Sequence, residues 1–160
     1  MTLLMTLLLV AGPVTTSVEY DHQVDFSQYK TWSWHEGGTA AMNPVTDKAI
    51  RDAIEKGLAA RGLSRVDTSA ALFVVYHASR TTQIDVLTAK SASPAPPSGI
   101  RYFQKGSLVV DVLDAGSGKV VWRGQAAAVL RYGPKEIAAQ VDAAVDEMLA
   151  RFPPSAQRVP

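Results

Sequence analysis

The chain has 160 residues, of which 47% are hydrophobic, so it is long enough and apolar enough to form one domain with a buried core. Its formal net charge is +1 and it holds no run of lysine or arginine, which argues against nucleic acid as a partner. It contains no cysteine, and this excludes disulfides, thiolate metal ligands and cysteine nucleophiles.

Residues 1–16 are similar to an export signal. Met1–Gly12 is an apolar run that is shorter than the about 20 residues needed to span a bilayer, but it has the length of a signal-peptide hydrophobic region. No basic residue precedes it, and a buried N-terminal helix is the alternative. Leu9–Gly12 resembles the first part of a bacterial lipobox, with Pro13 in place of the lipidated cysteine. We therefore expect a signal-peptide-like segment, cleaved or uncleaved, without lipidation at position 13.

Two strand patterns follow this segment. Residues 14–24 alternate in polarity, which predicts a strand with Val18, Tyr20 and His22 on its buried face. Thr31–Trp34 is a second, short β-prone run that places both of its tryptophans on one face.

A helix and a central strand come next. Asn43 and Pro44 have the pattern of a helix cap and first turn, and Gly62 is expected to end the helix. The predicted buried stripe consists of Ile50, Ala53, Ile54, Gly57 and Leu58. Ala71–His77 is nearly apolar on both faces, which is typical of a central strand, and the run after it to Val86 can continue as a strand.

The clearest local pattern is a β-hairpin over Gly106–Gly124, with a turn at Asp114–Gly118. Leu108, Val110 and Val112 are expected on one face of its first arm. Trp122 in the second arm is expected to be the largest apolar contribution to the core. Gly116–Lys119 resembles the end of a phosphate-binding P-loop, but Val120 and a strand follow it, so we interpret it as a turn.

A last helix is predicted to begin at Gly133 and Pro134 and to stop before the prolines at 153 and 154. Its buried stripe comprises Ile137, Val141, Ala144, Val145, Met148 and Leu149, with Phe152 near its end. Residues 87–99, rich in proline, serine and alanine, predict a mobile connector within the domain.

These elements predict an α+β fold, a two-layer sandwich of one largely antiparallel sheet with two helices packed on one face. The other sheet face is expected to be open to solvent or to a partner. The predicted organisation is a signal-peptide-like segment at 1–16, a single domain at 17–153 and a loose tail at 154–160.

Four aromatic residues form the candidate surface for a ligand or partner. Tyr29, Trp32, Trp34 and Tyr76 are able to line a groove for an apolar or sugar ligand, and core packing is the alternative.

Catalytic and metal sites have weaker support. A metal site built on histidines needs the strand of His22 beside the strand of His77, and no pair with helical metal-ligand spacing occurs. Asp111 and Asp114 form a candidate acid–base pair, but we interpret Asp111 as a solvated strand residue and Asp114 as a turn residue. An enzyme site requires that two or more of His22, His77, Asp111 and Arg123 converge in a pocket.

Six pieces of the chain, taken in their order and spacing, carry a family resemblance: Tyr20-Asp21, Asp25–Trp34, Leu58–Leu63, Leu72–His77, Gly106–Asp114 and Val121–Gly124. Together they resemble a family of bacterial lipoproteins, the domain of unknown function 4136. The chain departs from the family pattern at Pro13, where the lipidated cysteine is expected, and at Ala71, where an aspartate is frequent. The resemblance implies a cell-envelope protein on the periplasmic side and implies no activity.

Two functions remain open at this point. The first is a non-catalytic binding or assembly module of the envelope, without cofactor or metal, whose partner is an envelope protein, a lipid or a cell-wall component. In this case we expect membrane association only through the N-terminal segment. The second is an envelope hydrolase or metal-dependent enzyme with an unrecognised site.

Overall fold

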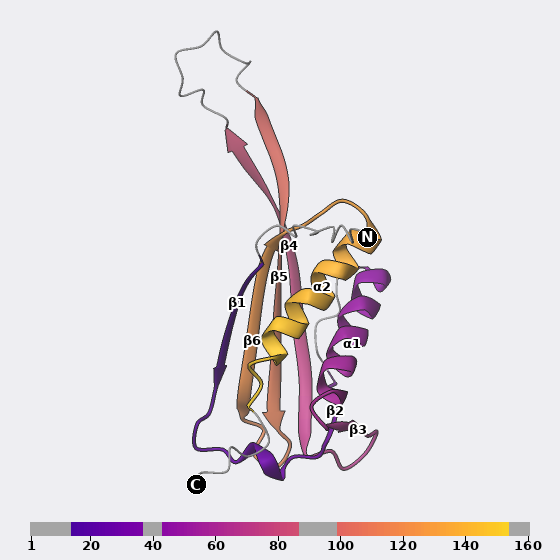
Figure 1. The fold of residues 1–160 in the computed structure, drawn as a ribbon, viewed down its shortest axis with the longest axis vertical. Helices are drawn as coiled ribbons and strands as arrows, with labels where there is room; N and C mark the ends of the chain where they lie inside the picture. Colours follow the sequence, from indigo (N-terminus) through magenta and orange to yellow (C-terminus); the bar gives the residue numbers. More distant parts are fainter. Residues whose placement is uncertain (1–13, 37–42, 87–98, 154–160) are drawn as a thin grey trace, which may run out of the picture.

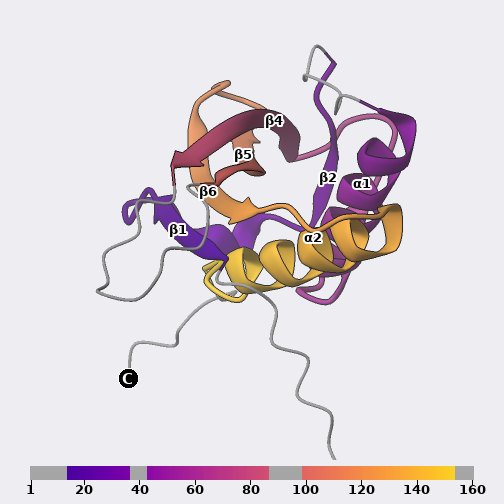
Figure 2. The same ribbon diagram turned by 90° about the horizontal axis from the view of Figure 1, so that it is seen from above.

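One sheet and two helices make up the described part of the chain, which comprises residues 14–36, 43–86 and 99–153 of the computed structural model. The elements are β1 (Thr15–Tyr20), a 3-10 turn (Phe26–Gln28), β2 (Thr31–Trp34), α1 (Pro44–Ala59), β3 (Ser64–Arg65), β4 (Leu72–Val86), β5 (Ile100–Asp114), β6 (Val120–Val129) and α2 (Pro134–Leu149). The strand order is β1-β6-β5-β4-β2-β3 (Figure 1). Both helices lie on the same face of the sheet (Figure 2), so the predicted α+β sandwich is confirmed.

The sheet is mixed rather than purely antiparallel. β1, β6, β5 and β4 pair antiparallel in turn, whereas β2 runs parallel to both β4 and β3. A parallel pair needs a crossover connection, and α1 lies in the chain between β2 and β4. The signal-like segment up to residue 13, the connector at 87–98 and the tail at 154–160 lie outside the described residues.

The first helix begins and ends where the sequence predicts. The Asn43 side chain accepts a hydrogen bond from the Thr46 backbone N–H at 2.9 Å, which caps the first turn. At the other end, Gly62 has a φ of +79° and the Leu63 N–H donates to the Leu58 carbonyl at 3.1 Å. All five predicted stripe residues are buried.

The hairpin is also confirmed. Leu108, Val110 and Val112 are buried on the helix side, and Trp122 is completely buried among them. The Asp114 side chain accepts from the Ser117 N–H at 2.7 Å, and this stabilises the turn. Because strand β6 follows the turn directly, the P-loop interpretation of Gly116–Lys119 is excluded.

The first strand is shorter than predicted. β1 ends at Tyr20, which is 39% exposed, and His22 is an exposed turn residue rather than a buried strand residue. The physical reason is the Asp21 side chain, which accepts a hydrogen bond from the Gln23 N–H at 2.9 Å and bends the backbone away from the ladder.

The central strands β4 and β5 are much longer than the helices that cover them. Each has 15 residues, about 50 Å at about 3.3 Å per residue, whereas each helix has 16 residues, about 24 Å. The predicted continuation of β4 to Val86 is confirmed, and the two strands protrude from the body as a ribbon (Figure 1). We call this ribbon, residues 80–86 and 100–105, the arm.

Candidate functional site

The structure brings three of the four predicted aromatic residues together. The ring centroids of Trp32 and Trp34 are 5.1 Å apart, and those of Trp34 and Tyr76 are 6.0 Å apart. Trp32 and Tyr76 are buried and Trp34 is half-buried. Tyr29 is also buried but belongs to another cluster, beside Phe26.

A cation from the first helix already occupies the faces of this aromatic cluster. The Arg51 guanidinium carbon lies 4.8 Å from the Trp34 ring centroid and 5.4 Å from that of Tyr76, within the range of cation–π attraction. Asp47 holds Arg51 by an ion pair at 3.0 Å and accepts a hydrogen bond from the Tyr76 hydroxyl. The accessible edge is the Trp34 indole, whose N–H donates to Glu55 at 3.0 Å. The assignment of these residues to a ligand surface stays a prediction.

Tyr29 serves the hairpin turn. Its hydroxyl donates to the Asp114 carboxylate at 2.8 Å. Burial, followed by this hydrogen bond, raises the pKa of Tyr29 to about 12. The pKa of Asp114 is lowered, chiefly by hydrogen bonds from Ser117 and then from Tyr29. Both shifts favour the bonded pair near neutral pH, so Asp114 is a turn residue, as predicted.

Two of the four candidate enzyme residues, Asp111 and Arg123, contact each other in the structure. Asp111 and Arg123 make a two-pronged ion pair, with N–O distances of 2.6 and 2.9 Å, on the sheet face opposite the helices. His77 lies on the same face, but His22 lies in the turn after β1. Within the described ranges, no cluster of three or more His, Cys, Asp or Glu residues is able to hold a metal ion.

Asp111 is not the solvated residue that the sequence predicted. It is only 5% exposed, because Val75 and Arg123 are its neighbours on the adjacent strands and the Arg123 side chain covers its carboxylate. The hydrogen bond and negative charge of Asp111 raise the pKa of Arg123. The two charges therefore neutralise each other.

The sheet face opposite the helices carries four large apolar side chains. Half-buried side chains surround the ion pair there: Phe73, Val75, Val109 and Leu113. No helix or strand in the part of the chain that the structure describes covers this face. We call it the uncovered face.

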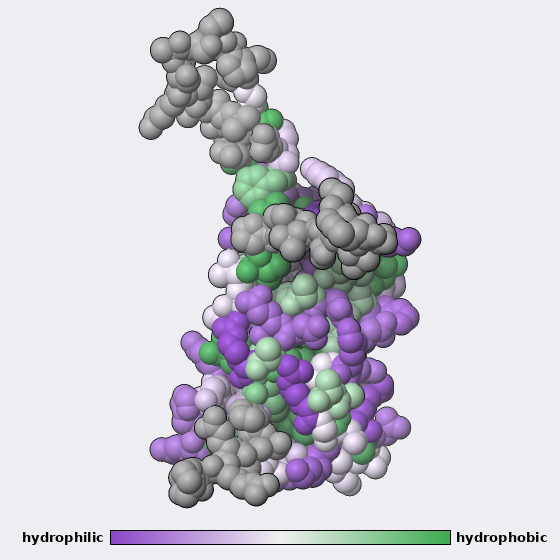
Figure 3. All heavy atoms as spheres, in the orientation of Figure 1, coloured by the Kyte–Doolittle hydropathy of each residue, from purple (hydrophilic) through white to green (hydrophobic). Residues whose placement is uncertain are grey.

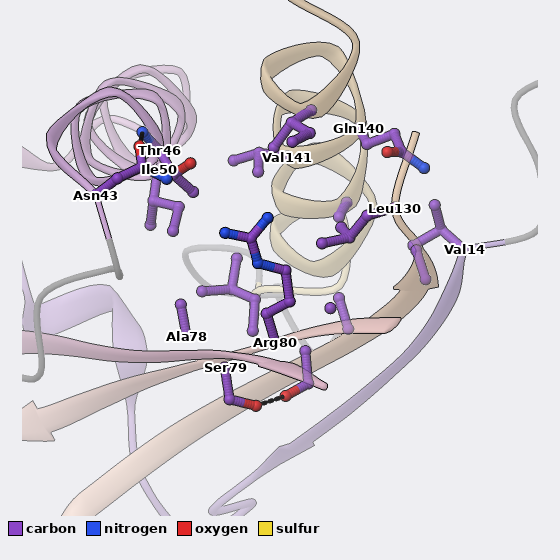
Figure 4. Close-up of a pocket in the computed structure, with 17 residues that line it drawn as sticks. Val14, Asn43, Thr46, Ile50, Ala78, Ser79, Arg80, Leu130, Gln140 and Val141 are labelled. Atoms are coloured by element: carbon purple, nitrogen blue, oxygen red, sulfur yellow. Dashed lines mark hydrogen bonds between the residues drawn. The ribbon is translucent and has the colours of Figure 1, made fainter. Parts of the chain in front are cut away.

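Sequence reasoning missed a cavity between the sheet and the first turns of both helices (Figure 4). Its volume is about 90 Å³, and its walls are mainly apolar. Small residues leave this space, namely Ala78, Gly106, Ala126, Ala128 and Ala144. The sequence signal for the cavity was that small residues occur on three strands and one helix. Their facing positions can be recognised only once the pairing register of the strands is known.

The family model of a domain of unknown function, DUF4136, matches residues 16–154. The chain belongs to this family. No curated protein matches it. The motifs that carry the family resemblance lie mainly in the scaffold of this DUF4136 domain: Trp32, Leu58, Leu72 and Trp122 are all fully or almost fully buried.

The DUF4136 domain is similar in fold to solved structures. A PDZ domain protein from Parabacteroides distasonis has 18% identity and a TM-score of 0.59 over 89% of this chain, which spans only 35% of that protein. The dodecamer of a point variant of PelC from Paraburkholderia phytofirmans has 10% identity and a TM-score of 0.59 over 90% of this chain and 100% of that chain. A second PelC dodecamer structure, in another crystal form, has 11% identity and a TM-score of 0.53 over 86% of this chain and 96% of PelC. Identities this low establish a common fold alone.

Neither helix of the DUF4136 domain, within the residues that the structure describes, has the length and hydropathy needed to cross a bilayer.

Proposed function

We propose that this chain is a non-catalytic binding or assembly module of the bacterial cell envelope. The observation that carries the proposal is the uncovered face, where Phe73, Val75, Val109 and Leu113 are half-buried but lack a covering layer among the described elements. Apolar surface that a single-layer sheet leaves open is a common place for a partner to bind. The apolar segment Met1–Gly12 supports export to the envelope.

The arrangement of the polar residues supports binding rather than catalysis. Asp111 and Arg123 on the uncovered face bind each other through two hydrogen bonds, and Asp114 binds its turn and Tyr29. A catalytic acid or base needs an accessible proton-transfer position, and the Asp111 carboxylate, which is 5% exposed, offers none.

The fold itself is compatible with assembly. PelC, which shares this fold over its whole length, is described as a dodecamer. An envelope protein, a lipid or a cell-wall component is the expected partner, and further copies of the chain are one form that a protein partner can take.

Site-specific photocrosslinking in a bacterial host tests this proposal. A photoreactive residue at Gln125, which is exposed on the uncovered face, is compared with one at Lys48, whose side chain is 75% exposed on α1. The full chain is expected in the envelope fraction, with a discrete crosslinked product from position 125 and none from position 48. A product of twice the chain mass identifies self-assembly.

Two results contradict the proposal. Recovery of the full chain only from the cytoplasm contradicts the proposed envelope location. Equal crosslinking from positions 125 and 48 means that the uncovered face is not the binding surface.

A further inference from the structure

The cavity between the helices and the sheet has an apolar interior, because its polar wall groups are bonded to other groups or point away from it. The Asn43 side chain accepts from the Thr46 backbone N–H, and the Ser79 and Ser107 hydroxyls, 2.6 Å apart, lie on the sheet face opposite the helices (Figure 4). The Gln140 side chain donates to the Val129 carbonyl and accepts from the Arg131 N–H, both at 2.9 Å. What remains is a wall of aliphatic side chains: Ile50, Leu108, Leu130, Ile137 and Val141. The occupant of the interior must therefore be apolar.

Arg80 places a cation at this cavity. Of the described residues that line it, Arg80 alone is charged, and its side chain rises from β4 into the space between the two helices (Figure 4). One guanidinium N–H donates to Gln104 at 2.9 Å, while the side chain remains exposed. No carboxylate of the described residues lies within ion-pair distance of it. A guanidinium has five N–H donors, so most of its capacity is available.

The surroundings of Arg80 add positive potential. Both helices begin beside the cavity, α1 after the capping residue Asn43 and α2 at Pro134, so the positive ends of two helix dipoles face this region. Each helix has one acid in its first turn: Asp47 of α1 binds Arg51 and Tyr76, and the Glu136 carboxylate lies against Gly133 at the start of α2, where it offsets part of that dipole. The charge at the opening is complementary to an anion.

An apolar space with a cation at its opening matches one ligand class. We propose that the cavity binds the apolar end of an amphiphile whose anionic head, a carboxylate or a phosphate, pairs with Arg80. The head forms charge-assisted hydrogen bonds with the guanidinium. The tail enters between Ile50, Leu108 and Val141.

The cavity volume limits the tail. An engineered apolar cavity of about 150 Å³ holds the six carbons of benzene, so about 90 Å³ accommodates about four carbons. Beyond the opening, hydrophobic side chains continue along the arm (Figure 3), where Ile84 is 61% and Tyr102 is 60% exposed and the two form a cross-strand pair. Longer tails therefore gain only the weaker contacts of an open surface.

Calorimetric titration of the full chain with short amphiphiles tests the proposal. The probes are sodium butyrate, hexanoate and octanoate, then hexyl phosphate, and hexanol as the uncharged analogue. We expect hexanoate to bind at least tenfold more tightly than hexanol. From butyrate onward, affinity should rise by up to about fourfold per methylene while the cavity fills, and then level off. Comparison of hexanoate with hexyl phosphate shows whether a fatty acid or a phosphate-headed lipid is the better match.

Variants of the protein separate the contribution of the anionic head to the affinity from that of the apolar tail. Arg80→Ala should weaken hexanoate at least tenfold without changing hexanol, and Arg80→Lys should restore part of the loss. Lys105→Ala is the matched control, because it removes an exposed cation one residue before the cavity-lining Gly106. Ala144→Leu fills the cavity and should abolish binding of both probes, and Ala128→Leu replaces it if the first variant does not fold.

The proposal is overturned if wild-type protein binds hexanoate no more tightly than hexanol. It is also overturned if Arg80→Ala and Lys105→Ala have equal effects, or if a folded cavity-filling variant binds as well as wild type. These results do not depend on where the chain is located in the cell.

Discussion

The replacement of Gly124 by alanine tests whether the packing of Trp122 determines the sequence of β6. An ideal Cβ at Gly124 would lie 2.5 Å from Trp122 Cη2 and 3.0 Å from Met148 Sδ. Neither neighbour has free space, because both are completely buried and the Trp122 ring packs on Phe152 at 5.4 Å. Overpacking of this kind costs about 1–3 kcal/mol, whereas the change from glycine to alanine in a strand gains about 0.5–1 kcal/mol.

We therefore expect Gly124→Ala to lower the free energy of unfolding by about 1–2 kcal/mol, a fall of about 3–8 °C in Tm. Urea denaturation followed by circular dichroism measures it. Gly116→Ala is the control, because its Cβ would meet only Asp114 Oδ1, at 3.4 Å, and the expected change is within about 0.5 kcal/mol. The smaller ring of Trp122→Phe should relieve the clash, so the double-mutant cycle should be non-additive. A Gly124→Ala variant as stable as wild type, with an additive cycle, would refute the reasoning.

Three other predictions follow from single contacts. Trp122→Ala removes a completely buried ring and should cost about 3–5 kcal/mol or prevent folding, and an unchanged Tm contradicts this. Because the folded-state pKa of Tyr29 is raised to about 12 from about 10, its stabilisation should be complete below pH 10 and be lost as the pH rises toward 12. Urea midpoints across this range should decline less steeply for Tyr29→Phe, and identical slopes count against the pairing with Asp114. Arg123→Ala leaves the Asp111 carboxylate without its two-pronged partner and should lower the free energy of unfolding by about 1–3 kcal/mol. Arg123→Lys should recover only part of this loss, because lysine cannot form both hydrogen bonds. Urea midpoints equal to that of wild type would mean that the pair contributes nothing to stability.

The elements that the sequence predicts correctly are those decided by neighbours in the chain. Asn43 caps α1 through a residue three positions away, and Gly62 ends it through its own backbone conformation. The parallel pairing of Thr31–Trp34 depends instead on where α1 returns the chain, and four residues of strand contain no signal for it. The prediction of His22 as a buried strand residue was wrong for a local reason that the alternating polarity does not reveal. The Asp21 side chain accepts a hydrogen bond from the Gln23 N–H and so competes with the strand hydrogen bonds.

The burial of Asp111 shows why sites are harder to predict than elements. Counting back from the turn pairs Leu113 with Val120 and would place Asp111 opposite Trp122. A bulge between Val112 and Leu113 shifts the register by one residue, so Asp111 faces Arg123 instead. In the same way, the aromatic pair on β2 was predictable from alternation, but the cation that covers it comes from α1 and depends on helix–sheet packing.

The cavity and the arm have one physical cause, the difference in length between strands of about 50 Å and helices of about 24 Å. Where the helices begin, the core face of the sheet loses its cover, and large side chains there would be exposed to water. The chain instead places Gly106 and small alanines at this boundary, and the Leu130 side chain lies where a Cβ of Gly106 would be. Beyond it, apolar residues return at Ile84 and Tyr102. A helix layer as long as the strands would bury both features, so the short helices are what leaves the proposed anionic-amphiphile site open.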